Sequence, residues 1–153
     1  MLTKRPRMRM TLIKAIVFAT VLMPLVARAE SPDDILIVAN RSVSLDSITA
    51  FQAKDIFLRK KTAWNDGQKA VPVHAQKGNK LRDDFRDRVL GMSHDQMQMY
   101  WVKHRIVSGQ TEPVSFPNPL KAVFKLKGAL GYIYRSQYKE GVVKILLVID
   151  AGK

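Results

Sequence analysis

The fold of this chain is decided by the stretch Ile35-Leu36-Ile37-Val38-Ala39, which ends at Asn40. Five consecutive apolar residues, three of them β-branched, are typical of a strand that is buried on both faces of its sheet. The run is too short for a helix of ordinary length. It therefore predicts a buried strand, and the elements that must cover that strand are found by reading on along the chain.

Capping residues indicate where the helices begin. Thr49 and Gln52 form a T-x-x-Q capping box, which predicts a helix that ends near residues 59–61. Asn79 is expected to cap a second helix, which closes at Gly91. Ser93 and Gln96 form another capping box. The helix that follows it is expected to bury one face, made of Met97, Tyr100, Trp101, His104 and Val107.

Further strands are expected at residues 70–74, 129–134 and 142–148, with a short helix over residues 120–124 that is closed by Gly128. Pro72 favours an edge position or a strand start for the first of these strands. The resulting order is strand, helix, strand, three helices and two strands. It predicts an α/β sandwich around a mixed, mainly parallel sheet.

The N-terminus has the layout of a secretory signal peptide. Lys4, Arg5, Arg7 and Arg9 precede an apolar run over residues 15–27, and Ala27-Arg28-Ala29 is a small-x-small cleavage site. The run has about 13 residues, fewer than the roughly 20 that span a bilayer. We expect residues 1–29 to be removed, leaving residues 30–153 as a single periplasmic domain without a membrane span. The alternative is an uncleaved N-terminal anchor.

The net charge indicates which classes of partner the chain could bind, and the cysteine count indicates whether it could form disulfides. The full chain has 26 basic and 13 acidic residues, a net charge of +13. Six of the basic residues and none of the acidic ones precede Glu30, so the remaining 124 residues carry a net charge of +7. This charge favours anionic partners, but nothing resembles a nucleic-acid-binding motif, and we expect no nucleic acid partner. With no cysteine, the chain forms no disulfide and must rely on its core.

A series of landmarks between residues 35 and 134 resembles the phosphate-binding-protein-like domain, the type II periplasmic solute-binding fold of phosphate ABC transporters. The landmarks are Ile37-Val38-Ala39-Asn40, residues 43–48, Asp55-Ile56-Phe57-Leu58, Trp64, Val71-Pro72-Val73, Phe85, Val89-Leu90-Gly91, Tyr100-Trp101 and Gly128-Ala129-Leu130-Gly131-Tyr132-Ile133. Full members of the family clamp an anion between two lobes. This chain is long enough for one lobe, and it resembles the second.

The resemblance also implies where a ligand would bind. The family's second-lobe ligands lie in an Arg-x-x-Gly-Ser-Gly-Thr turn, which corresponds here to residues 75–81. Only Gly78 matches, since Ala75, Asn79 and Leu81 stand at the positions of the arginine, the serine and the threonine. Arg59 replaces the glycine that usually follows Ile-Phe-Leu.

The local charge makes this turn the candidate site. A helix N-terminus attracts anions, and the candidate ligand-binding residues are Lys77, Gly78, Asn79, Lys80 and Arg82. The alternative is a solvated cap, in which Asn79 closes the helix and the lysines keep the surface soluble.

Other polar clusters are expected to be structural. The alternating acidic and basic residues at 82–88 are typical of a salt-bridged outer helix face. His74, His94 and His104 show no metal-ligand spacing, and no serine lies in a nucleophile motif. We therefore expect no catalytic site, metal or cofactor.

Two functions remain open. The first is an exported, non-catalytic solute-binding-like protein that binds phosphate or another small anion as an accessory to transport. The second is an envelope interaction module that keeps the fold, has lost the ligand site and binds an envelope or transporter protein through its basic surface.

Overall fold

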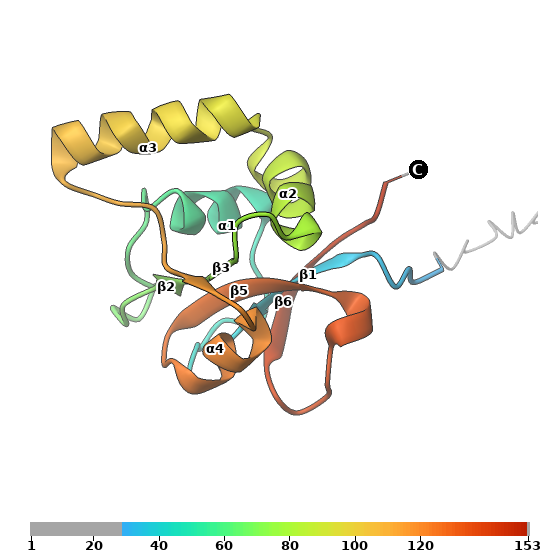
Figure 1. Cartoon of the computed structure of the whole chain (residues 1–153). Coiled ribbons are helices and arrows are strands. Elements are labelled where there is room, and N and C mark those ends of the chain that lie inside the picture. Colours follow the sequence, from blue (N-terminus) through green and yellow to red (C-terminus); the bar gives the residue numbers. More distant parts are fainter. Residues whose placement is uncertain (1–28, 153) are drawn as a thin grey trace, which may run out of the picture.

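The computed structural model of the chain describes residues 29–152. The predicted signal peptide lies outside the described residues, except for Ala29, and stays a prediction. A four-stranded sheet with the order β2-β5-β1-β6 forms the middle of the described part (Figure 1). Its strands are β1 (Ile35–Ala39), β2 (Val71–Pro72), β5 (Ala129–Tyr134) and β6 (Lys144–Ile149). A smaller sheet pairs β3 (His74–Ala75) with β4 (Ser115–Phe116).

Helices cover both faces of the four-stranded sheet (Figure 1). One face carries α1 (Ala50–Phe57), α2 (Lys80–Phe85), the π-helical turn η1 (Arg86–Leu90) and α3 (His94–Ser108). The other face carries α4 (Pro119–Lys125). A 3-10 turn, η2 (Arg135–Gln137), lies between β5 and β6. The prediction of a single α/β sandwich is confirmed. Among residues 29–152, no helix combines the length and apolar character that crossing a membrane requires.

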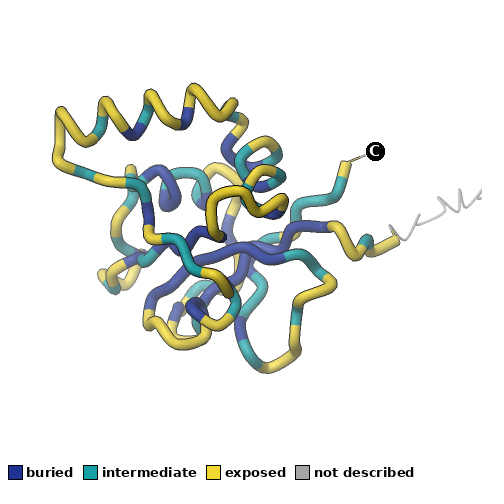
Figure 2. The backbone as a smooth tube through the Cα atoms, in the orientation of Figure 1, coloured by how far each residue is buried: buried dark blue, intermediate teal, exposed yellow. Residues whose placement is uncertain are grey.

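β1 is buried along its whole length, as its sequence predicted (Figure 2). Ile35, Ile37 and Ala39 belong to the core beneath α1, α2 and α3. Leu36 and Val38 belong to the second core, against α4. This alternation follows from the two-residue period of a strand, which sends neighbouring side chains to opposite faces.

The sheet is mixed, as expected, but the expectation that it is mainly parallel is wrong. β1 is antiparallel to both β5 and β6, and only the two-residue pairing of β2 with β5 is parallel in this sheet. The order of elements along the chain does not reveal this. Both partners of β1 come from the last third of the sequence, and strands so far apart can pair in either direction. β2 lies at the edge of the sheet, as Pro72 indicated.

The predicted helix starts are confirmed. The side chains of Thr49 and Ser93 each accept a hydrogen bond from the third helical residue, and both capping boxes are complete. Asn79 caps α2, and after η1 the chain turns at Gly91, which has a φ of 61°. The first helix ends slightly early, at Phe57.

The buried face predicted for α3 is only partly correct. Met97 and Trp101 are buried, but His104 is half-exposed and Val107 is 75% exposed. The reason is visible in Figure 1, where the C-terminal half of α3 extends past the helices beneath it. A helical apolar stripe is buried only where another element lies against it.

Two glycines allow close packing around β5. A Cβ atom on Gly131 would lie 2.5 Å from the Cγ2 atom of Val123, so the glycine lets α4 approach the strand. Gly128 has a φ of +74°, and a Cβ atom there would lie 2.2 Å from the carbonyl oxygen of Lys69. The Gly128 carbonyl accepts a hydrogen bond from Nε1 of Trp64 at 2.9 Å.

Candidate anion-binding site

The turn predicted to bind an anion precedes α2, and the structure divides its residues between two environments. Lys77, Gly78 and Arg82 line a pocket between this turn, α2, η1 and α3. Asn79 and Lys80 lie outside the lining of that pocket. Asn79 instead accepts a hydrogen bond from the Leu81 amide at 3.0 Å, so it acts as the helix cap.

Lys80 is already paired with a carboxylate. Its Nζ atom lies 2.6 Å from Oδ2 of Asp84, which also accepts a hydrogen bond from the Tyr134 hydroxyl at 2.7 Å. Arg88 contacts the same oxygen at 3.1 Å. Burial acts to raise the pKa of Asp84, but the hydrogen bonds from Lys80 and Tyr134 and the nearby cations together lower it. The Lys80 ammonium thus forms an ion pair on the surface of α2 and does not line the pocket.

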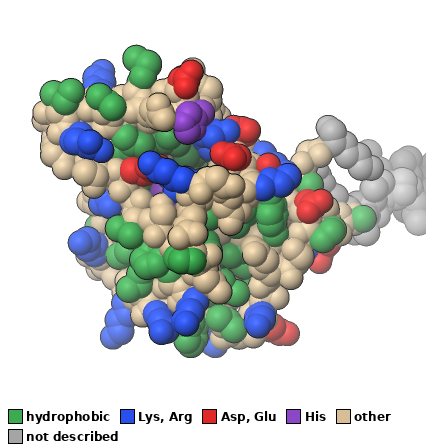
Figure 3. All heavy atoms as spheres, viewed as in Figure 1, with side chains coloured by type: hydrophobic (Ala, Val, Ile, Leu, Met, Phe, Trp, Pro, Cys, Tyr) green, Lys and Arg blue, Asp and Glu red, His purple; other side chains and the backbone are tan. Residues whose placement is uncertain are grey.

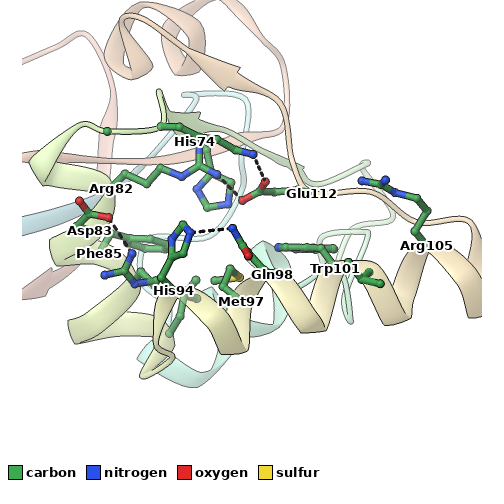
Figure 4. Close-up of a pocket in the computed structure, with 15 residues that line it drawn as sticks. His74, Arg82, Asp83, Phe85, His94, Met97, Gln98, Trp101, Arg105 and Glu112 are labelled. Atoms are coloured by element: carbon green, nitrogen blue, oxygen red, sulfur yellow. Dashed lines mark hydrogen bonds and ion pairs between the residues drawn. The ribbon is translucent and has the colours of Figure 1, made fainter.

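Arg82 is held at the wall of the pocket by three partners. Its guanidinium donates to the carbonyl oxygen of Ala75 at 2.8 Å and to Oγ of Ser115 at 2.7 Å. It also forms an ion pair with Glu112. Lys77 contacts the other oxygen of that carboxylate, at 3.8 Å. Glu112 therefore stands where an external anion would contact both cations (Figure 4).

The pocket has a volume of about 280 Å³. One part of its lining is polar and includes His74, Lys77, Arg82, Arg105 and Glu112. The other part is apolar and consists of Phe85, Leu90, Met97, Trp101 and Val102. Figure 4 shows that α3 supplies Met97, Gln98 and Trp101 to one wall, while Arg82, His74 and Glu112 form the opposite wall. A ligand here would meet cations on one side and carbon on the other.

His74 is the most buried polar residue in the pocket, with 2% of its surface exposed. Its Nδ1 atom lies 2.9 Å from the Tyr132 hydroxyl, whose oxygen already accepts a hydrogen bond from the Ala75 amide at 3.1 Å. Nδ1 is the acceptor that the described residues place within reach of the Tyr132 hydroxyl proton, and donation to it leaves both groups paired, so we assign the imidazole proton to Nε2. Burial, with the charges of Arg82 and Arg59, lowers the pKa of His74 to about 3. The ring is therefore neutral, and its Nε2–H group has no acceptor among the described residues.

Two more buried donors lack a partner. Nε1 of Trp101 and Nε of Arg59 are both covered, and neither forms a hydrogen bond with any residue that the structure describes. A hydrogen bond joins α3 to the segment after α1, in which the Tyr100 hydroxyl donates to the carbonyl oxygen of Leu58 at 2.8 Å. Arg59 has a φ of 54° and, within residues 29–152, is the only residue other than glycine with a positive φ. Its sequence position is the one where the resemblance implies glycine.

The acidic residues of α2 and η1 are structural, as expected. Arg86 pairs with Asp83 at 2.8 Å and with Asp87 at 2.9 Å. His94 contacts Gln98, and the His104 ring lies on that of Tyr100 at a centroid distance of 4.0 Å. Within the described part of the chain, no group of three or more acidic, histidine or cysteine side chains could hold a metal ion.

Sequence reasoning found Lys77, Gly78 and Arg82 but missed His74, Trp101 and Glu112 as members of one pocket. Glu112 lies 30 residues beyond Arg82, in a loop-rich stretch that carries no local sign of the contact. His74 was noted only for lacking metal-ligand spacing. Its position next to the aligned turn was the one signal that could have placed it at the site.

No known family profile matches the sequence. No curated protein matches it either. Solved structures do resemble it, each over 74% of this chain. One is a putative phosphate ABC transporter substrate-binding protein with bound phosphate from Clostridium perfringens, at 22% identity and a TM-score of 0.57. Another is an ABC-type phosphate transport receptor from Vibrio cholerae, at 19% identity and a TM-score of 0.60. A third is PstS from Borrelia burgdorferi, at 12% identity and a TM-score of 0.58.

The similarity covers 44%, 45% and 46% of those three chains, so this chain spans less than half the length of the proteins it resembles. Because the sequence identities are this low, the similarity establishes a shared fold and no more. The mixed sheet and the helices on its two faces are the features the chains have in common with one lobe of such proteins. This chain therefore has a phosphate-binding-protein-like fold, that of a single lobe of a type II periplasmic binding protein.

Proposed function

We propose that this chain is a non-catalytic, solute-binding-like protein that binds phosphate or another small anion as an accessory to transport. The observation that carries the proposal is the basic pocket, in which Lys77, Arg82 and Arg105 surround a space of about 280 Å³. Arg105 forms no ion pair within the described residues, so its charge is available. The proteins with a similar fold are named as phosphate transport proteins, and one of them holds phosphate.

Binding is expected to be weak. A single lobe leaves the ligand open to water on one side, and water and salt screen the attraction between charges. Glu112 also neutralises part of the positive charge of Arg82 and Lys77. We expect a dissociation constant of roughly 1 mM, equivalent to about 4 kcal/mol, and a fall in affinity as salt is added.

An NMR titration with inorganic phosphate tests this proposal. The amides of residues 77–82 should shift first, and Lys77→Ala should weaken the shifts because Lys77 faces the pocket. Lys80→Ala should weaken them less, since Lys80 is paired with Asp84. Lys127→Ala changes the net charge equally at an exposed position on the connection between α4 and β5, and serves as the control. If phosphate at tens of millimolar moves none of these amides, the anion-binding role is wrong.

Export is part of the same proposal. The basic start, the short apolar run and the Ala27-Arg28-Ala29 site support cleavage after Ala29. N-terminal sequencing of the protein from a periplasmic fraction should therefore begin at Glu30. Recovery of the uncut chain from the cytoplasm would contradict both the cleavage and the periplasmic location.

One observation favours the alternative of an interaction module. The outer face of α3 exposes four apolar side chains, namely Met99, Val102, Ile106 and Val107, with exposed fractions of 73%, 56%, 79% and 75%. Figure 3 shows hydrophobic side chains exposed along the top of the molecule, where α3 lies in Figure 1. Such a face commonly marks a protein contact. A photo-crosslinking residue at position 106 should then trap an envelope protein in intact cells, and one at position 127 should not.

A further inference from the structure

The pocket contains two buried hydrogen-bond donors for which residues 29–152 provide no acceptor. They are Nε2 of His74 and Nε1 of Trp101, on opposite walls of the same pocket. Buried polar groups are nearly always hydrogen-bonded, so an unsatisfied one calls for an explanation. Both groups act as donors: an indole nitrogen has no other role, and with the Tyr132 hydroxyl donating to Nδ1 the His74 proton is assigned to Nε2. The missing partner is therefore an acceptor.

The charges around the donors favour an acceptor that is negatively charged. The Arg59 and Arg82 cations both act on the His74 ring. Arg82 is balanced by Glu112, whereas Arg59 forms no ion pair within the described part of the chain and its Nε atom is covered. An anion that reaches His74 would also be attracted by Arg59.

The rest of the lining argues against a bare inorganic ion. Phe85, Leu90 and Met97 present only carbon or sulfur to the pocket. A phosphate ion against them would lose water on that side without gaining hydrogen bonds, and this loss is costly. An apolar group gains free energy from the same contact. The volume of about 280 Å³ is near the lower end for small-molecule pockets, roughly 300 Å³.

We propose that the pocket binds a small organic anion, a carboxylate on an apolar body, rather than inorganic phosphate. The carboxylate accepts hydrogen bonds from His74 and Trp101, and the apolar body packs on Phe85, Leu90 and Met97. Phe85 and Leu90 are at most 1% exposed and both donor atoms are covered, so entry requires the side chains over them to move. Lys77 and Val102 are free to do so because their exposed fractions are 80% and 56%. This inference rests on the proposed anion-binding function and narrows the class of its ligand.

The two tryptophans of the chain provide the test. Each gives one indole N–H signal in an NMR spectrum. Trp64 donates its proton to Gly128, away from the pocket. The purified protein is titrated at constant ionic strength with benzoate, acetate, inorganic phosphate and the neutral benzamide. Benzoate should shift the Trp101 indole signal and leave that of Trp64 in place. Its affinity should exceed the affinities of acetate, phosphate and benzamide by about tenfold or more.

A pair of matched variants tests the Trp101 donor. Trp101→Phe keeps an aromatic ring but loses the N–H group, and should weaken benzoate binding about tenfold, as expected for a hydrogen bond to a charged group. Trp64→Phe is the control and should leave the affinity for benzoate unchanged. Thermal unfolding of both variants establishes that they are folded.

The outcomes separate the inference from the function on which it rests. If phosphate or acetate binds as tightly as benzoate and shifts the amides of residues 77–82, the inference is overturned while the anion-binding function stands. If benzamide binds as tightly as benzoate, the pocket does not select for charge, and the inference is again overturned. If no anion shifts any pocket signal, both are wrong.

Discussion

Glu112 is the single residue that most limits the pocket's attraction for anions. Its carboxylate pairs with Arg82 and lies 3.8 Å from the Lys77 ammonium. We predict that Glu112→Gln strengthens phosphate binding by about 1 kcal/mol, or roughly fivefold, because the amide still accepts a hydrogen bond from Arg82 but carries no charge. The measurement is the phosphate titration. Glu140→Gln makes the same change in net charge at an exposed residue, and equal gains in the two variants would mean that only the overall charge matters.

Arg59 adopts a backbone conformation that suits glycine. A φ of 54° places it in the left-handed region, which costs a residue with a Cβ atom roughly 1–2 kcal/mol. We predict that Arg59→Gly raises the free energy of unfolding by about 1 kcal/mol, as measured by urea denaturation. At the neighbouring Lys60, where φ is not positive, the change to glycine should lower it by about 0.5 kcal/mol. Destabilisation by Arg59→Gly would show that the arginine side chain contributes more than its backbone strain costs.

At the scale of the element, α3 is held to the body of the protein by its N-terminal half. Trp101 is 5% exposed, and it packs in the main core with Met97. We predict that Trp101→Ala lowers the free energy of unfolding by roughly 3–5 kcal/mol, the range for removing a large buried aromatic side chain. Lys103→Ala, on the exposed side of the same helix, should change it by less than about 0.5 kcal/mol. Similar small effects at both positions would mean that α3 does not pack through Trp101.

Elements whose signals are local could be predicted from the sequence. The caps at Thr49, Asn79 and Ser93 lie within three residues of the groups they satisfy, and all three were predicted. The direction of the pairing between β1 and β5 could not be predicted, because it joins residues about 90 positions apart. Contacts between residues far apart in the sequence were likewise missed at the candidate site. Lys77, in the turn before α2, and Arg82, in its first turn, are five residues apart and were predicted together, whereas Glu112 comes from a distant loop.

At the scale of the whole molecule, His74 makes stability depend on pH. Its pKa is lowered to about 3, chiefly by burial, against about 6.5 in an unfolded chain. Between these values the unfolded state binds a proton that the folded state does not, so stability is full above pH 6.5 and falls with decreasing pH. The slope reaches about 1.4 kcal/mol per pH unit. Carboxylates with lowered pKa values, such as Asp34 and Asp46, contribute to pH dependence only at lower pH, near their unfolded pKa of about 3.9.

We therefore predict that His74→Gln removes most of the loss of stability between pH 6.5 and pH 4.5. Chemical denaturation at a series of pH values measures it. His104→Gln makes the same substitution at a half-exposed position on α3 and should keep the slope of the unaltered protein. An unchanged slope in His74→Gln would show that the folded state takes up the proton at His74 without penalty.

The position of β1 between β5 and β6 also determines how much of the chain must be synthesised before the sheet can form. A ribosome completes β1 about 90 residues before it reaches β5 and about 105 before β6. Until then, five apolar residues have neither of their neighbouring strands, and the central layer of the core is absent. Sheets assembled from such distant segments form slowly. The sheet of the nascent chain therefore stays incomplete until the ribosome has made β6, so both neighbouring helical layers are synthesised before the layer between them can form.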